Sequence, residues 1–75
     1  MKVTVRTGSW ARQYMPRETA ELQLPEGAAV ADAIGRLDIP PQEIGLVALD
    51  GKAVPLQTPL AEGDIVRVFP VIIGG

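Results

Sequence analysis

Apolar and polar residues alternate along three stretches of the chain, at residues 2–6, 20–24 and 65–69. A period of two points successive side chains to opposite faces of a β-strand, so each stretch is expected to form a strand with one face in a core. In the last stretch, Val66 and Val68 should face inward and their immediate neighbours should face outward.

A hairpin is predicted between two shorter apolar stretches, 46–49 and 53–54. Asp50-Gly51 separates them, and this dipeptide is a strong short-range signal for a two-residue hairpin turn. A further turn is expected at Glu62-Gly63-Asp64, just before the last strand. The pattern therefore predicts four or five strands.

One helix is predicted in the middle of the chain, where apolar residues recur at helical spacing: Val30, Ala33, Ile34 and Leu37. The helix must be short because Pro40-Pro41 forbid its continuation. Asp32 and Arg36 are four residues apart and are expected to form an ion pair on another face. A single turn is expected at residues 42–44. The aperiodic stretch before the second strand should be a long loop, with Trp10 and Tyr14 packed locally rather than forming a ligand site.

One helix with four or five strands predicts an α+β domain, in which the helix covers one face of a mixed sheet. Placing the last strand beside the first gives the β-grasp, or ubiquitin-like, arrangement. The domain is expected to span residues 1–69, followed by a flexible tail over 70–75. The expected core combines the inward positions of strands and helix: Val3, Val5, Leu22, Leu24, Val30, Ile34, Leu37, Val47, Val66 and Val68.

The composition excludes several classes of site. The 75 residues include no Cys and no His, which argues against disulfides, zinc or iron–sulfur centres, and a Cys or Ser–His nucleophile. Scattered acidic residues lack metal-ligand spacing, so no metal and no cofactor are expected. The net charge of −2 gives no footprint for nucleic acid. The longest apolar run is too short to span a membrane, and the first strand leaves no room for a signal peptide, so a cytoplasmic, monomeric protein is expected.

Gly74-Gly75 follow a short apolar run after the last predicted strand. A frayed glycine tail would give the same pattern, but here the tail directly follows a strand. This combination would carry a carboxylate away from the domain on a stalk without side chains. Such a stalk can enter a narrow channel and adopt backbone angles closed to other residues.

In its element order and last third, the chain resembles the MoaD/ThiS family, the ubiquitin-like sulfur carriers of molybdopterin and thiamine biosynthesis. Asp50-Gly51 is similar to the family hairpin, and Glu62-Gly63-Asp64 is similar to its acidic-Gly-Asp turn. The segment from Phe69 to Gly75, FPVIIGG, is similar to the family's terminal signature. Phe69-Pro70 is closer to the molybdopterin branch and Val71-Ile72 to the thiamine branch, so the pathway stays open, with tRNA thiolation as another destination.

The resemblance implies that the chain is a substrate rather than an enzyme. The carboxylate of Gly75 would be adenylated from ATP by an adenylating enzyme of the ubiquitin-activating type, similar to MoeB or ThiF. A sulfur donor such as a cysteine desulfurase or a rhodanese would then leave a thiocarboxylate on Gly75. An acceptor synthase would receive the sulfur. No nucleic acid or membrane partner is implied.

These expectations assign two groups of residues. The residues that thread into the activating enzyme are Val71, Ile72, Ile73 and Gly74, with Gly75 as the covalent attachment point. Docking is expected to use Phe69, Arg67 and Ile65, unless Phe69 instead folds over the sheet edge. Two alternatives remain at this stage: a protein modifier joined to target lysines through Gly75, and a non-covalent β-grasp binding domain.

Overall fold

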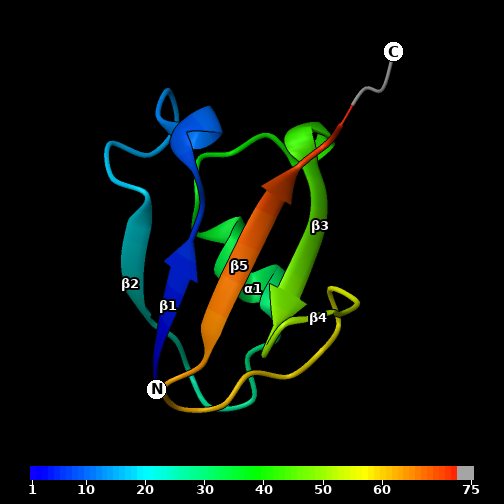
Figure 1. Cartoon of the computed structure of the whole chain (residues 1–75). Coiled ribbons are helices and arrows are strands. Elements are labelled where there is room, and N and C mark those ends of the chain that lie inside the picture. The colour runs from blue at the N-terminus through cyan, green and yellow to red at the C-terminus, as the bar shows by residue number, and fades with distance from the viewer. Residues whose placement is uncertain (73–75) are drawn as a thin grey trace.

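The computed structural model describes residues 1–72 and forms one five-stranded sheet with one α-helix (Figure 1). The strands are β1 (Lys2–Arg6), β2 (Thr19–Gln23), β3 (Ile44–Leu49), β4 (Lys52–Ala53) and β5 (Ile65–Pro70). The helix is α1 (Val30–Gly35), and two short 3-10 helices are η1 (Ser9–Ala11) and η2 (Pro41–Glu43). None of these helices is long and apolar enough to span a membrane.

The strand order β2-β1-β5-β3-β4 confirms the β-grasp fold. β1 and β2 form an antiparallel hairpin, and β5 lies parallel to β1 in the centre of the sheet. β3 pairs antiparallel with β5 on its other side, and β4 extends that edge. As Figure 1 shows, α1 lies against one face of the sheet, behind β1 and β5 in that view. The opposite face of the sheet is called the open face below.

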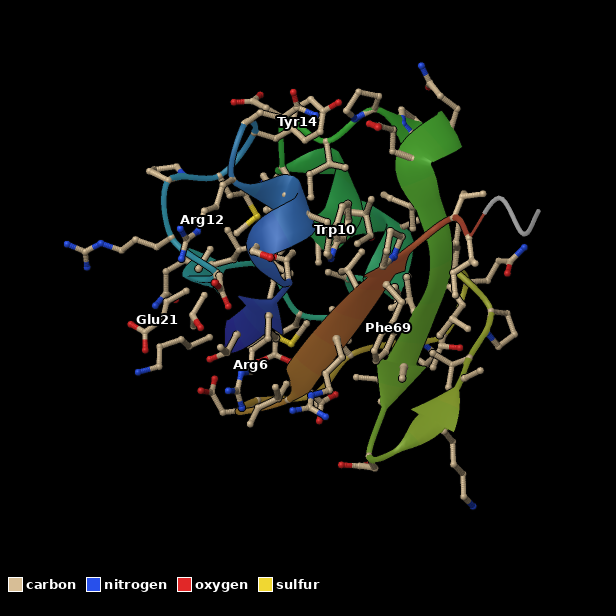
Figure 2. The ribbon with its side chains drawn as sticks, turned by 45° about the horizontal axis from the view of Figure 1, so that its top comes forward. Arg6, Trp10, Arg12, Tyr14, Glu21 and Phe69 are labelled. Carbon is tan, nitrogen blue, oxygen red and sulfur yellow. The ribbon has the colours of Figure 1, made fainter. Side chains whose placement is uncertain are left out.

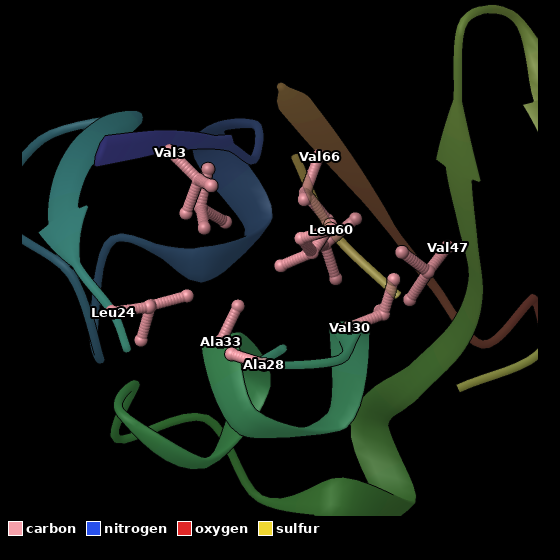
Figure 3. Close-up of a cluster of buried hydrophobic side chains, with 10 residues drawn as sticks. Val3, Leu24, Ala28, Val30, Ala33, Val47, Leu60 and Val66 are labelled. Carbon is pink, nitrogen blue, oxygen red and sulfur yellow. The ribbon is translucent and has the colours of Figure 1, made fainter. Parts of the chain in front are cut away.

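The core lies between the sheet and α1 (Figure 3). Val3, Val5 and Val66, on the neighbouring strands β1 and β5, are fully buried, and so is Val30 on the helix. Of the ten predicted core residues, seven are buried, and Leu22, Ile34 and Leu37 are half-buried against the same cluster. The register of the predicted strands and helix is therefore confirmed. Small residues at Ala28 and Ala33 let α1 approach the sheet closely.

The predicted Asp50-Gly51 turn is confirmed between β3 and β4. Both residues have positive φ, 50° at Asp50 and 78° at Gly51, as the favoured two-residue hairpin turn requires. The strand bounds differ slightly from expectation. β3 begins two residues earlier than predicted, at Ile44, and β5 runs one residue further, through Pro70.

The predicted ion pair between Asp32 and Arg36 is wrong. The Asp32 carboxylate instead accepts a hydrogen bond from the backbone N–H of Ala29 at 2.7 Å, which caps the start of α1. The Arg36 guanidinium donates to the carbonyl of Gln23 at 3.2 Å, and so joins the helix to the end of β2. Each side chain instead satisfies a backbone group that lacks a partner at the end of its helix or strand.

The long segment between β1 and β2 is more structured than predicted. It contains η1 and builds a second small core from Ala11, Met15 and Ile39. Trp10 is half-buried and packs against both clusters, so it joins this segment to the main core. Trp10 therefore packs within the fold as expected, but its contacts reach the main core as well as its own segment.

Candidate functional site

The base of the C-terminal tail is held by the pairing of β5 with β3. Phe69 pairs with Leu46 and Pro70 with Ile44, and the register shifts between these two pairs, with Gly45 as the extra residue. Beyond the strand, the N–H of Val71 donates to the carbonyl of Glu43 at 3.0 Å. The tail therefore leaves the body from a fixed point at one end of the sheet.

A side-chain hydrogen bond fixes the segment that supplies this carbonyl. The hydroxyl of Tyr14 donates to the Glu43 carboxylate at 2.5 Å, across 29 residues of sequence. The hydrogen bond, the partial burial of Tyr14 and the negative charge of Glu43 together raise the pKa of Tyr14 above its ordinary value. Sequence spacing gives no sign of this bond, because its two partners are 29 residues apart.

Three large apolar side chains are exposed on the open face of the sheet, two of them near the tail. Phe69 is 43% exposed and Ile65 is 48% exposed, both pointing away from α1 because the alternate positions of β5 are buried. Leu46, opposite Phe69 in the β3–β5 pairing, is 47% exposed. Phe69 therefore lies exposed on a central strand, as the outward direction predicts. Phe69, Leu46 and Ile65 are called the apolar patch below.

Two arginines lie beside the apolar patch. Arg67 on β5 is paired in register with Arg6 on β1, and both side chains are exposed on the open face. Figure 2 shows Arg6 and Phe69 close to β5, with Trp10 further along the sheet. A hollow of about 300 Å³ extends between these groups and is lined in part by Arg6, Arg67, Trp10 and Phe69.

The predicted site residues thus fall into three sets. Phe69, Arg67 and Ile65 share the open face, as the sequence predicts. Val71 is 44% exposed and Ile72 is 86% exposed just beyond the sheet, while Ile73, Gly74 and Gly75 lie outside the described residues. Leu46 and Arg6 were not among the docking residues predicted from the sequence. Their roles depend on which strands are neighbours and in what register.

The comparisons with known proteins agree with this architecture. Residues 10–75 match the model of the ThiS family. No curated protein sequence matches the chain.

The chain is also similar to solved structures over nearly its whole length. SAMP1 from Haloferax volcanii has a TM-score of 0.79 at 20% identity, with 100% of both chains covered. A protein from Pyrococcus furiosus described as subunit 1 of a molybdopterin converting factor has a TM-score of 0.78 at 26% identity, covering 96% of this chain and 99% of that one. A second structure, of H. volcanii small archaeal modifier protein 1, has a TM-score of 0.77 at 19% identity, with 95% and 98% covered. With a family match over most of its residues and the ubiquitin-like fold throughout, the chain belongs to the ThiS family, in the MoaD/ThiS group.

Proposed function

We propose that this protein is a sulfur carrier whose Gly75 carboxylate is activated as an adenylate and converted to a thiocarboxylate. The observation that carries the proposal is the position of the tail. β5 contributes Val66 and Val68 to the core. In the sequence, the same strand is followed by Val71 and Ile72 and then by Ile73-Gly74-Gly75. Membership of the ThiS family supports the same role.

The proposed chemistry needs an external enzyme. A carboxylate is a poor electrophile, so one of its oxygens first attacks the α-phosphorus of ATP, and pyrophosphate leaves. The terminal sulfur of a persulfide on the sulfur donor then attacks the acyl carbon, and AMP leaves. A thiol of the donor finally breaks the sulfur–sulfur bond of this acyl intermediate, which leaves the thiocarboxylate on Gly75 and a disulfide on the donor.

In this scheme the chain acts as substrate and supplies no catalytic group. Its own contribution is to present the tail and to bind the adenylating enzyme. The five residues from Val71 to Gly75 can span at most about 18 Å when extended. That reach would let Gly75 enter a buried nucleotide site while the folded body stays outside.

Docking on the adenylating enzyme is proposed to use the apolar patch with Arg67. Exposed apolar side chains on one face of the sheet, two of them next to the tail, are typical of a protein interaction site. Phe69 is its natural anchor, because large aromatic side chains carry much of the binding energy at protein interfaces. The acceptor synthase is proposed to receive the sulfur afterwards.

The test compares the intact mass of the wild-type chain with that of a variant lacking Gly75, after incubation with the adenylating enzyme, ATP and a sulfur donor. Replacing oxygen by sulfur adds about 16 Da to the wild type, and we expect no addition to the variant. Deletion withdraws the carboxylate by about 3.5 Å, and misplacement by even ~1 Å can lower a rate about a hundredfold.

Gly35→Ala is the matched control, since it changes a glycine on α1, far from the tail in sequence, and should be charged like the wild type. Equal sulfur incorporation with and without Gly75 would overturn the proposal. The protein-modifier alternative has its own readout. Blots for conjugates of higher mass, lost on deletion of Gly75, would favour that function instead.

A further inference from the structure

The two arginines of the open face form a pair of like charges that has no ion-pair partner among residues 1–72. Arg6 and Arg67 stand in register on adjacent parallel strands, so their side chains are immediate neighbours. Their flanking partners in the same row of the sheet are Thr19 on β2 and Ala48 on β3, which carry no charge. Like charges directly opposite each other on a sheet are destabilising.

Three of the other five basic side chains, excluding Arg17 and Lys52, have partners within the described residues. Lys2 pairs with Glu21 at 3.8 Å, Arg12 pairs with Glu18 at 3.3 Å, and Arg36 donates to a backbone carbonyl. Within residues 1–72 no ion pair involves Arg6 or Arg67. Asp50 and Asp64 line a second hollow together with both arginines, but neither aspartate forms an ion pair with them. The Asp64 carboxylate, however, accepts the N–H of Ala61 at 2.8 Å and is used in a turn.

The surroundings of the pair fit a particular kind of partner group. The hollow of about 300 Å³ is lined by both arginines and by the apolar groups of Trp10, Phe69 and Pro70. Guanidinium groups bind carboxylates through paired hydrogen bonds, and aromatic rings bind apolar side chains. A partner that carries an acidic side chain next to an apolar one could therefore bind both the arginines and the aromatic rings of the hollow.

The overall charge argues for a protein carboxylate rather than a nucleic acid. The chain carries nine acidic and seven basic residues, and its net charge is −2. A polyanion would be repelled by most of this surface, and two arginines alone make a small phosphate footprint. A short acidic element of a folded partner meets only the local positive charge.

We propose that Arg6 and Arg67 together bind an acidic loop of the adenylating enzyme, with an adjacent apolar side chain of that loop seated against Trp10 and Phe69. This inference rests on the proposed function and adds the charge that selects the partner. It assigns Arg6, on the first strand, to the same interface as the tail-bearing strand. The pair steers and orients the complex, and it takes no part in the chemistry at Gly75.

The test measures the KM and kcat of charging for Arg6→Glu, Arg67→Glu and the double variant, across a range of salt concentrations. Each single reversal should raise KM about tenfold and change kcat less than about twofold, because the tail and the nucleotide site are untouched. Wild-type KM should rise with salt, and this dependence should be weaker in the double variant. Arg17→Glu, an exposed arginine in the loop before β2, is the matched control for net charge.

Stability separates a binding role from a structural one. A single reversal places Glu beside Arg, an attractive cross-strand pair, so the melting temperature should hold or rise while KM worsens. KM values for Arg6→Glu and Arg67→Glu equal to that of Arg17→Glu, which changes the net charge by the same amount, would overturn the proposal, even with normal charging of the wild type. Binding of the double variant to tRNA is measured as well. If this variant lost binding to tRNA while its binding to the adenylating enzyme was unchanged, the proposal would be overturned in favour of a nucleic acid partner. Failure of the wild type to be charged at all would instead reject the proposed function.

Discussion

Gly45 lies directly against the backbone of Pro70, where β3 meets the end of β5. A Cβ atom at position 45 would lie 2.8 Å from the carbonyl carbon of Pro70, and closer still to its oxygen. Both groups are backbone, so neither can rotate away as a side chain would. This close approach, together with the bond from Val71 to the Glu43 carbonyl, fixes where the tail leaves the domain.

Gly45→Ala should therefore destabilise the fold and displace the tail base. Forcing an extra carbon into a packed site typically costs about 1–3 kcal/mol. For a domain of this size that corresponds to a melting temperature lower by about 5–20 °C. Thermal unfolding followed by circular dichroism measures the shift. Gly35→Ala is the control, since its Cβ would meet nothing within 4 Å, and it should leave the melting temperature unchanged or raise it. Equal melting temperatures for both variants would contradict the close approach.

The opposite orientations of Ile65 and Val66 give a second prediction. Val66 is fully buried, so Val66→Ala should lower the free energy of unfolding by about 2 kcal/mol. Ile65 is 48% exposed, and Ile65→Ala should lower it by about 0.5 kcal/mol or less while weakening binding to the adenylating enzyme. Denaturant titration measures both stabilities. A larger loss of stability at Ile65 than at Val66 would show that the faces of β5 are reversed.

The strands and helix of this fold could be predicted because their periodicities are local. Valines at positions 3, 5, 66 and 68 mark one face of each central strand, and the structure buries all of them. The structure of the segment between β1 and β2 could not be predicted in the same way. Its stability depends on Ile39, which comes from beyond α1 and packs on Ala11 and Met15. A contact between residues so far apart leaves no periodic signal.

The candidate site shows the same division. The outward direction of Phe69 follows from alternation along β5, and the sequence was sufficient to predict it. The arginine pair could not be predicted, because Arg6 meets Arg67 only through the parallel register of β1 and β5. The Tyr14–Glu43 bond likewise requires the η2 turn to lie beside the loop that carries Tyr14.

The Tyr14–Glu43 bond predicts a dependence of stability on alkaline pH. The bond raises the pKa of Tyr14 in the folded state above its value in the unfolded chain, near 10. Its stabilisation is therefore fully present below pH 10 and is lost as the pH rises through the higher folded-state pKa. Tyr14→Phe should be less stable than the wild type near pH 8, and this difference should shrink above pH 10. Urea titrations of both proteins between pH 8 and 11 measure it. Tyr14 is the sole tyrosine of the chain, so a difference independent of pH would contradict the assignment.

Phe69→Ala should weaken the complex with the adenylating enzyme more than it weakens the fold. Truncating a buried aromatic anchor of an interface often costs 2 kcal/mol or more, which would raise the Kd about thirtyfold. In the free protein Phe69 is 43% exposed and loses chiefly its cross-strand contact with Leu46, a loss of about 1 kcal/mol or less.

Leu56→Ala supplies the matched control for this prediction. Leu56 is 47% exposed, and its backbone carbonyl contacts the start of α1, away from the open face. Titration calorimetry with the adenylating enzyme gives the Kd of each variant, and thermal unfolding gives its stability. If Phe69→Ala binds like Leu56→Ala, the apolar patch is not the docking surface. If its loss of binding is matched by an equal loss of stability, Phe69 serves the fold. Weaker binding by a stably folded Phe69→Ala variant, beside normal binding by Leu56→Ala, is the outcome that an exposed aromatic next to the tail predicts.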